Sequence, residues 1–151
     1  MLRLVSAALT AVLLSGCGSG DAVSSAGARS ACEAFHEAFA EVPGVLTGWR
    51  DGSFRYDAAA HDGCVVTVVG DTADMADGTP PAHLVHPESN PAFDSWEADL
   101  EADGKDGTSF RLRRQGIFCA VEGWWDGGDD QAPDVPRSTL FLISISCAVL
   151  T

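Results

Sequence analysis

The sequence is poor in positive charge. It contains 9 lysines and arginines against 22 aspartates and glutamates, a formal net charge of −13 at pH 7, and Lys105 is its only lysine. A surface this acidic repels phosphate groups, so we expect no nucleic-acid partner and no electrostatic attraction to anionic lipid head groups. Solubility is a sufficient reason for the acidity, and recognition of a basic partner is the alternative.

The sequence also lacks the short motifs of common catalytic and metal sites. It has no G-x-S-x-G, S-x-x-K or H-E-x-x-H pattern, and its cysteines form no C-x-x-C pair. His36 is expected on the solvent side of a helix, and His61 lies in a loop beside Asp62. Two polar neighbours do not make a catalytic triad, so we expect no enzyme.

No apolar run is long enough for a permanent membrane-spanning helix. Leu4–Leu14 is uncharged but short, and it follows Arg3 as in an export signal. The tetrapeptide Leu14-Ser15-Gly16-Cys17 resembles the lipobox of bacterial lipoproteins. The resemblance implies cleavage before Cys17, a diacylglyceryl thioether on its sulfur, and attachment to the extracytoplasmic face of the cell membrane. More than one acyl chain matters because a single chain binds membranes only marginally.

The expected organisation follows from this anchor. Residues 1–16 are the signal peptide, and an ordinary signal peptide that happens to precede a cysteine is the alternative. Residues 17–29 are rich in Gly, Ser and Ala without an apolar period, so they predict a lipidated flexible tether. Residues 30–151 are enough for a single domain.

Four cysteines remain after Cys17, an even number in an exported chain: Cys32, Cys64, Cys119 and Cys147. Such a set indicates two disulfides, for which three connectivities exist. The wide spacing argues against a zinc or thiol redox site.

An amphipathic helix is expected at the start of the domain. Ser30 and Glu33 fit a capping box, and Pro43-Gly44 ends the helix. Four apolar residues recur between them at helical spacing: Cys32, Phe35, Phe39 and Val42.

In chain order we then expect a turn at Asp51-Gly52, a short strand at 54–56, a loop at 58–63, a β-branched strand at 64–69 and a long surface loop at 71–90.

The second half predicts further strands. Asn90-Pro91 starts a short helical turn, and residues 91–102 run from that turn into a strand. Strands are expected at 110–113, 117–125 and 141–149 because apolar residues alternate there.

Register selects one disulfide pairing. If Cys119 faces Cys147, three other apolar pairs align: Ile117 with Val149, Val121 with Ile145, and Trp125 with Phe141. An antiparallel hairpin requires such same-face pairs, so we predict Cys119–Cys147 and, by elimination, Cys32–Cys64. The predicted fold is α+β: a twisted antiparallel sheet of about four to six strands with the N-terminal amphipathic helix packed on one face.

Three stretches resemble a group of small secreted or lipid-anchored bacterial proteins of unknown function: Gly63-Cys64 with the valines that follow, Ala102–Phe110, and Trp125–Asp130. The resemblance spans residues 60–147. It supports export and the fold, and it implies no chemistry.

One candidate binding face follows from the strand pattern. Trp124 and Trp125 are neighbours on one strand, so their rings face opposite sides of the sheet. Trp125 is expected in the core, and Trp124 is expected on the outer face with Phe118, Arg111 and Arg113. An aromatic ring beside arginines could stack on a sugar or anchor a protein partner. The alternative is that a loop or second helix covers this face.

Two weaker metal hypotheses come from acidic and histidine-rich stretches. Four carboxylates stand on a glycine-rich stretch and are calcium candidates: Asp126, Asp129, Asp130 and Asp134. A solvated turn is the better interpretation. His83 and His86 follow several aspartates, but Pro80-Pro81 and Pro87 argue against a helix that would present both imidazoles to a metal.

The sequence therefore predicts an extracytoplasmic lipoprotein acting as a non-catalytic binding module of the cell envelope, with no cofactor. Its partners would be the membrane, through the lipid on Cys17, and an unknown protein or cell-wall component. The alternatives are an envelope hydrolase with scattered residues and a calcium-stabilised structural module.

Overall fold

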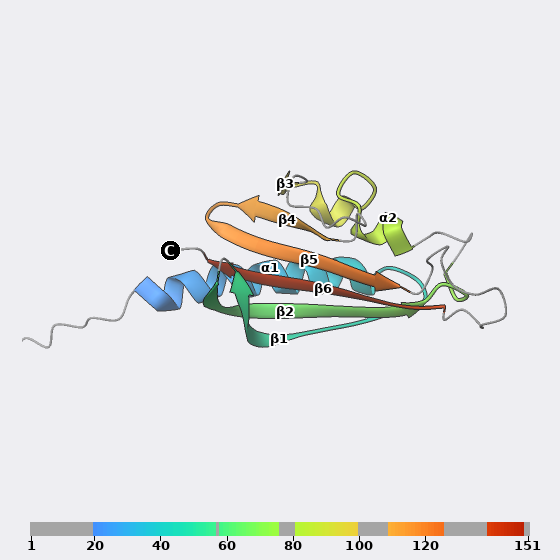
Figure 1. Ribbon diagram of the computed structural model, residues 1–151, viewed down its shortest axis with the longest axis horizontal. Coiled ribbons are helices and arrows are strands. Elements are labelled where there is room, and N and C mark those ends of the chain that lie inside the picture. Colours follow the sequence, from blue (N-terminus) through green and yellow to red (C-terminus); the bar gives the residue numbers. More distant parts are fainter. Residues whose placement is uncertain (1–19, 57, 76–80, 100–108, 126–138, 150–151) are drawn as a thin grey trace, which may run out of the picture.

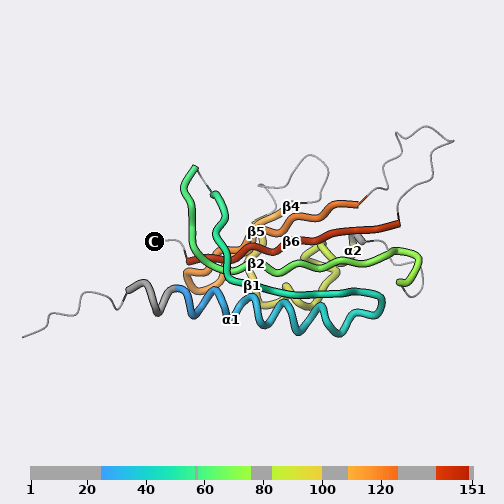
Figure 2. Tube along the Cα trace, turned by 90° about the horizontal axis from the view of Figure 1, so that it is seen from below, coloured from blue at the N-terminus to red at the C-terminus, as the bar shows by residue number. Residues whose placement is uncertain are grey.

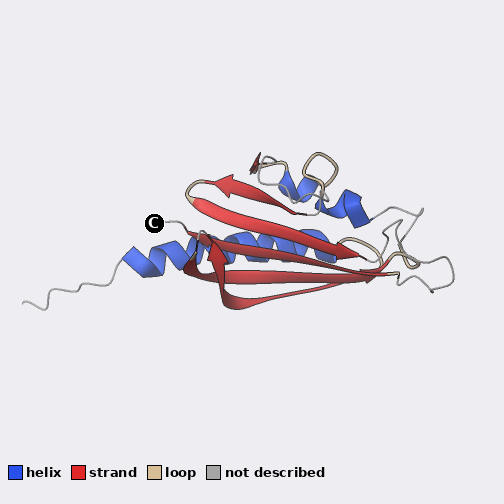
Figure 3. Ribbon diagram, in the orientation of Figure 1, coloured by secondary structure: helices blue, strands red, loops and turns tan. Residues whose placement is uncertain are grey.

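The computed structural model describes residues 20–56, 58–75, 81–99, 109–125 and 139–149. Within these residues the chain forms one antiparallel sheet in the order β1-β2-β6-β5-β4-β3 (Figure 1). The strands are β1 (Val45–Tyr56), β2 (Ala59–Asp71), β3 (Glu97–Asp99), β4 (Ser109–Arg114), β5 (Ile117–Trp125) and β6 (Leu140–Val149). The long helix α1 (Gly20–Ala40) lies along one face (Figure 3). The predicted antiparallel sheet with a helix on one face and two disulfides is confirmed.

α1 begins at Gly20, whereas the capping box predicted a start at Ser30. Residues 25–29, expected in the flexible tether, are helical, and Ala28 is fully buried. Gly27 also lies close to the sheet, because a Cβ there would be in ordinary van der Waals contact with Ile117 Cδ1 at 3.4 Å. The interpretation of this segment as a spacer was wrong, since small residues also allow a helix to approach a sheet closely.

The core lies between α1 and the sheet. Cys32, Phe35 and Phe39 on the helix are buried, as are Cys64 and Val66 on β2. The predicted apolar stripe is therefore confirmed for these three helix residues, whereas Val42 lies after the end of α1 and is partly buried. The Cys32–Cys64 disulfide fastens the helix to the strand. None of the described helices is long and apolar enough to cross a membrane.

α1 runs antiparallel to β1. Near the middle of the helix, Arg29 Nη2 lies 2.8 Å from Asp51 Oδ2. About two turns further on, His36 Nδ1 lies 3.2 Å from Thr47 Oγ1. Later residues of the helix therefore meet earlier residues of β1, and α1 ends beside the start of that strand. His36 faces the sheet, so its predicted place on the solvent side of the helix was wrong.

β1 and β2 form one long hairpin, so the predicted turn at Asp51-Gly52 and the predicted loop at 58–63 were wrong. β2 pairs with β6 as far as Gly63, which faces Gly52 on β1, and the part of the hairpin beyond these pairs bends away from the sheet; Figure 2 shows the bend. A Cβ on Gly63 would overlap the carbonyl oxygen of Cys147 and lie 2.9 Å from its carbonyl carbon. Glycine allows this close approach, and the end of the hairpin rises from the sheet on the side away from α1.

The predicted surface loop at 71–90 contains packed structure where the chain is described. Met75, Leu84 and Val85 are buried, the last two on the short helix α2 (Pro81–Val85). The prolines fit this helix, because Pro81 is its first residue and Pro87 follows its end. The prediction failed because two apolar side chains are too weak a pattern to reveal a helix of one turn.

Residues 91–99 confirm the predicted helical turn that runs into a strand. The side chain of Asn90 accepts a hydrogen bond from Ala92 N (3.0 Å) at the start of the 3-10 helix η2 (Pro91–Phe93), which precedes β3. Phe93 packs on Phe35 with ring centroids 5.7 Å apart and meets Phe110 edge to face. The segment thus completes the core on the side of β4.

The register of β5 and β6 agrees with the prediction at every predicted pair. Cys119 faces Cys147, and the other three pairs are Ile117 with Val149, Val121 with Ile145, and Trp125 with Phe141. The Cys119–Cys147 disulfide joins the two strands. Both predicted disulfides are therefore confirmed.

Candidate functional site

The face of the sheet away from α1, here called the outer face, carries an exposed line of apolar side chains. Leu46 faces Val69, Val69 faces Leu142, and Leu142 faces Trp124, so the line crosses β1, β2, β6 and β5 in register. These four residues are the apolar row. Their exposed fractions are 79% for Leu46, 39% for Val69, 39% for Leu142 and 51% for Trp124. Leu140, two residues along β6 from Leu142, extends the row and is 59% exposed.

The apolar row lines two adjoining hollows. The first has a volume of about 530 Å³ and is lined by Val69, Trp124, Trp125, Leu140, Phe141 and Leu142. The second has a volume of about 570 Å³ and is lined by Gly44, Val45, Leu46, Val69, Gly70, Asp71, Asp74 and Leu140. Because Val69 and Leu140 line both, the two hollows adjoin, and together they are here called the end groove.

Three carboxylates flank the end groove: Asp71 is half-buried, and Asp74 and Glu122 are exposed. Asp71 and Asp74 line it on the β2 side, and Glu122 is exposed on the outer face two residues before Trp124 on β5. Hydrogen bonds from the Thr139 side chain and the Ala73 backbone lower the pKa of the Asp71 carboxyl below its ordinary value, because they favour its charged form. The groove therefore combines an apolar surface with fixed negative charge at its sides.

The structure separates the residues of the predicted binding face into exposed and covered ones. Trp124 is exposed as predicted, but Phe118 is only 1% exposed. The bent end of the β1–β2 hairpin covers Phe118: the Tyr56 ring lies 4.3 Å from it and the Phe54 ring 6.4 Å, centroid to centroid. Phe118 was wrongly assigned to an accessible surface, because no local pattern indicates that the hairpin folds back over the sheet.

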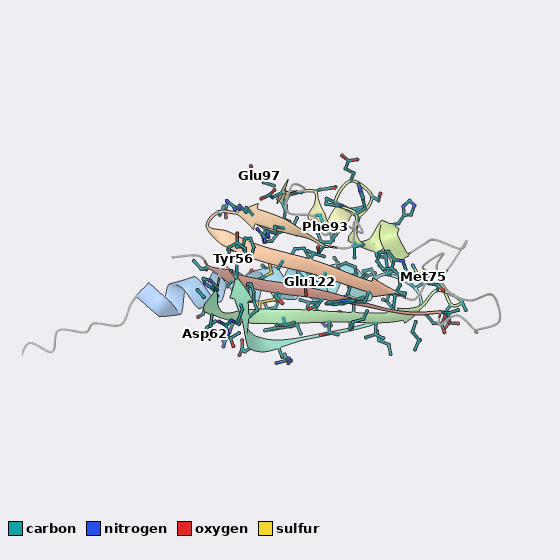
Figure 4. The ribbon with its side chains drawn as sticks, in the orientation of Figure 1. Tyr56, Asp62, Met75, Phe93, Glu97 and Glu122 are labelled. Atoms are coloured by element: carbon teal, nitrogen blue, oxygen red, sulfur yellow. A yellow bond between two sulfur atoms is a disulfide. The ribbon has the colours of Figure 1, made fainter. Side chains whose placement is uncertain are left out.

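The two arginines of the predicted face also lie apart from Trp124. Arg111 donates a hydrogen bond to the Tyr56 hydroxyl (3.2 Å), and its guanidinium lies 4.7 Å from the centroid of that ring. Arg113 is exposed and pairs in register with Phe118 and with Glu97. Figure 4 shows Tyr56 toward one end of the molecule, Met75 toward the other, and Glu122 between them. The arginines thus belong to the hairpin end, and Trp124 belongs to the end groove.

The four paired cysteines are structural. Cys119, Cys147 and Cys64 lie side by side across β5, β6 and β2, and Cys32 reaches Cys64 from α1. All four are fully buried. A buried disulfide has no free thiolate to act as a nucleophile or metal ligand, so these sulfurs stabilise the fold.

The histidines do not assemble a site with the acidic residues near them. His83 on α2 and His86 after it are both exposed, and His61 lies against the rings of Phe54 and Tyr56 at 6.2 and 6.3 Å. Across the described ranges, no three His, Cys, Asp or Glu side chains gather closely enough to hold a metal ion. Cys17 and the calcium candidates Asp126, Asp129, Asp130 and Asp134 lie outside the described residues.

Most of the end groove was missed in the sequence, although a signal for it existed. The alternation predicted for the strand at 141–149 directs Phe141 toward the core. Leu142, and Leu140 before the strand, therefore lie on the opposite side. Val69 likewise lies outward on its strand. A half-exposed strand normally alternates apolar with polar residues, so outward leucines and valines at one end of the sheet are the sign of a second apolar surface.

Comparisons with known proteins leave the function to be argued from these residues alone. No protein-family model matches the chain, no curated protein is similar to it, and no solved structure resembles it.

Proposed function

We propose that the protein is a lipid-anchored binding module of a bacterial cell envelope. The lipid on Cys17 holds it at the extracytoplasmic face of the membrane, and the end groove binds a partner without catalysis. The observation that carries the proposal is the apolar row, in which Leu46, Val69, Leu142 and Trp124 are exposed in register across four strands. Contiguous apolar side chains on a soluble domain are a feature of interaction sites, and tryptophan is enriched among residues that dominate binding energy.

The position of α1 supports this division of roles. Cys17 stands three residues before the start of α1, and the 21 residues of the helix extend about 30 Å. Because α1 runs antiparallel to β1, the strand ends that carry the end groove lie level with the far end of the helix, on the opposite face of the sheet; Figure 1 shows these strand ends. A lipid on Cys17 would thus hold the opposite end of the domain near the bilayer, which leaves the groove free to meet an envelope partner.

The anchor is tested by Cys17→Ser. We expect the variant to remain unlipidated and to leave the membrane fraction, because the acidic domain has no electrostatic attraction to the bilayer. Labelling with an alkyne fatty acid and fractionation by ultracentrifugation measure the two effects. An unchanged membrane fraction would contradict the anchor.

The binding surface is tested in living cells with a photoreactive amino acid at position 142, in the apolar row. The matched control places the same amino acid at position 113, which is exposed on the same face at the hairpin end. We expect a discrete cross-linked adduct from position 142 alone, and its loss when Trp124→Ala is added. No adduct at position 142, or equal adducts at both positions, would contradict the proposed surface.

A further inference from the structure

The end groove has a mixed chemistry that restricts its partner. Its surface is apolar along Leu46, Val69, Leu140 and the neighbouring residues. Carboxylates stand on both sides of it, with Asp71 and Asp74 toward β2 and Glu122 beside Trp124. A ligand that fills the groove must therefore offer apolar groups and must not bring negative charge close to these side chains.

Positive charge within the described part of the outer face begins farther away. The neighbouring row across the sheet consists of small, polar or acidic residues: Gly48, Thr67, Ser144, Glu122 and Ser109. The first arginines, Arg50 and Arg111, lie in the row after that, about 13 Å along the strands from the apolar row. Arg111 is already engaged by Tyr56. The charge beside the groove is therefore negative.

We propose that the end groove binds a basic, apolar peptide segment, whose apolar side chains lie along the apolar row and whose lysine or arginine side chains meet the flanking carboxylates. This inference rests on the proposed function and names the class of partner. Charge complementarity favours this class over anionic lipids, because the carboxylates repel their head groups. A sugar is disfavoured for a different reason, because the exposed leucines and valines offer it no hydrogen-bond partners. The hydrogen bonds to Asp71 help to keep its carboxylate charged.

The length of the apolar row sets the length of the segment. Neighbouring strands lie about 4.8 Å apart, so a row across four strands spans about 14 Å. An extended peptide covers this distance with about four or five residues, and an α-helix covers it with about three turns. A short amphipathic segment is therefore sufficient.

The test uses three fluorescein-labelled 15-residue peptides with one spacing pattern: leucine with lysine, leucine with glutamate, and serine with lysine. Fluorescence anisotropy measures their affinity for the soluble Cys17→Ser protein. We expect the leucine–lysine peptide to bind at least tenfold more tightly than either of the others. We also expect the Asp71→Asn/Asp74→Asn variant to weaken that binding several-fold, because it removes two of the flanking charges.

A control variant and a second groove variant test whether the loss of affinity is specific to the carboxylates beside the end groove. Glu97→Gln removes an exposed carboxylate at the hairpin end of the same face and should leave the affinity unchanged. Glu122→Gln removes the charge on the other side of the groove and should weaken binding, which repeats the test if the Asp71 variant unfolds. Increasing salt should lower the affinity of the native protein and of Glu97→Gln more than that of the Asp71→Asn/Asp74→Asn and Glu122→Gln variants.

Distinct results would overturn the inference. Equal affinity for the leucine–lysine and leucine–glutamate peptides, or affinity unaffected by loss of the carboxylates, would refute the charge requirement. Equal affinity for the serine–lysine peptide would refute the apolar requirement. Binding to phosphatidylcholine or phosphatidylglycerol vesicles that Trp124→Ala abolishes would assign the groove to lipid. In each case the cross-link at position 142 tests the proposed function separately.

Discussion

Substitution of Gly63 by alanine should destabilise the domain far more than the same substitution at Gly48. Both glycines belong to the β1–β2 hairpin. A Cβ on Gly63 would overlap the carbonyl oxygen of Cys147 and lie 3.1 Å from Ala148 Cα. A Cβ on Gly48 would meet no atom within 4 Å. The two variants therefore add the same methyl group to one hairpin in two opposite environments.

The magnitude follows from what Gly63 touches. The overlapping atom is a backbone carbonyl oxygen of β6 and cannot rotate away, so β2 and β6 must separate locally. Inserting a methylene into a packed core costs about 1–3 kcal/mol, and a clash with backbone places this site at the upper end, at about 3 kcal/mol. In Gly48→Ala the methyl group restricts the unfolded chain without a clash, which should stabilise the protein by about 0.4–1 kcal/mol.

Urea denaturation at equilibrium, with the disulfides intact, measures both changes. Trp49 packs against the core from β1 and supplies an intrinsic fluorescence signal. We expect the free energy of unfolding to fall by about 3 kcal/mol in Gly63→Ala and to stay equal or rise in Gly48→Ala. A loss below about 0.5 kcal/mol in Gly63→Ala would mean that the bend tolerates a side chain, and the close approach of β2 to β6 would be refuted.

Two further stability predictions concern the disulfide and the outer face. The Cys32→Ala/Cys64→Ala variant should lose about 3–4 kcal/mol, because the bridge closes a chain segment with a separation of 32 residues; a loss below about 1 kcal/mol in urea denaturation would contradict this. Phe118→Ala should lose about 3–5 kcal/mol, because the side chain is buried beneath the hairpin end. Trp124→Ala should change stability by less than about 1 kcal/mol, because its ring is half exposed. A reversed order of these last two in thermal denaturation would invert the assignment of the outer face.

Local patterns in the sequence were sufficient to predict how β5 and β6 pair. Strand residues alternate with period 2, so a single choice, Cys119 opposite Cys147, fixes the face of every other residue in the two strands. Ile117, Val121 and Trp125 all gain apolar partners in that register. Both disulfides follow from the same alternation, because with four cysteines one pairing leaves only one other.

The wrong predictions concern residues whose types are compatible with more than one local structure. Asp51-Gly52 resembles a turn, yet Gly52 serves a bend inside a continuous strand because it faces another glycine across the hairpin. The small residues before Ser30 resemble a linker, yet Ala28 is fully buried in a helix, and its carbonyl oxygen lies 2.9 Å from Cys64 Sγ on β2. In both cases the structure depends on a partner in another segment, so the local pattern could not distinguish the two possibilities.

Residue types and their spacing along the chain were enough to predict the register of β5 and β6 and both disulfides, and they set the acidic character of the protein. The surface available for binding, in contrast, follows from the arrangement of the strands in space. The bent hairpin buries Phe118, and the strand order places Leu46, Val69, Leu142 and Trp124 in one line. These outcomes depend on which strands become neighbours and where one of them bends, which is settled when the sheet assembles against α1.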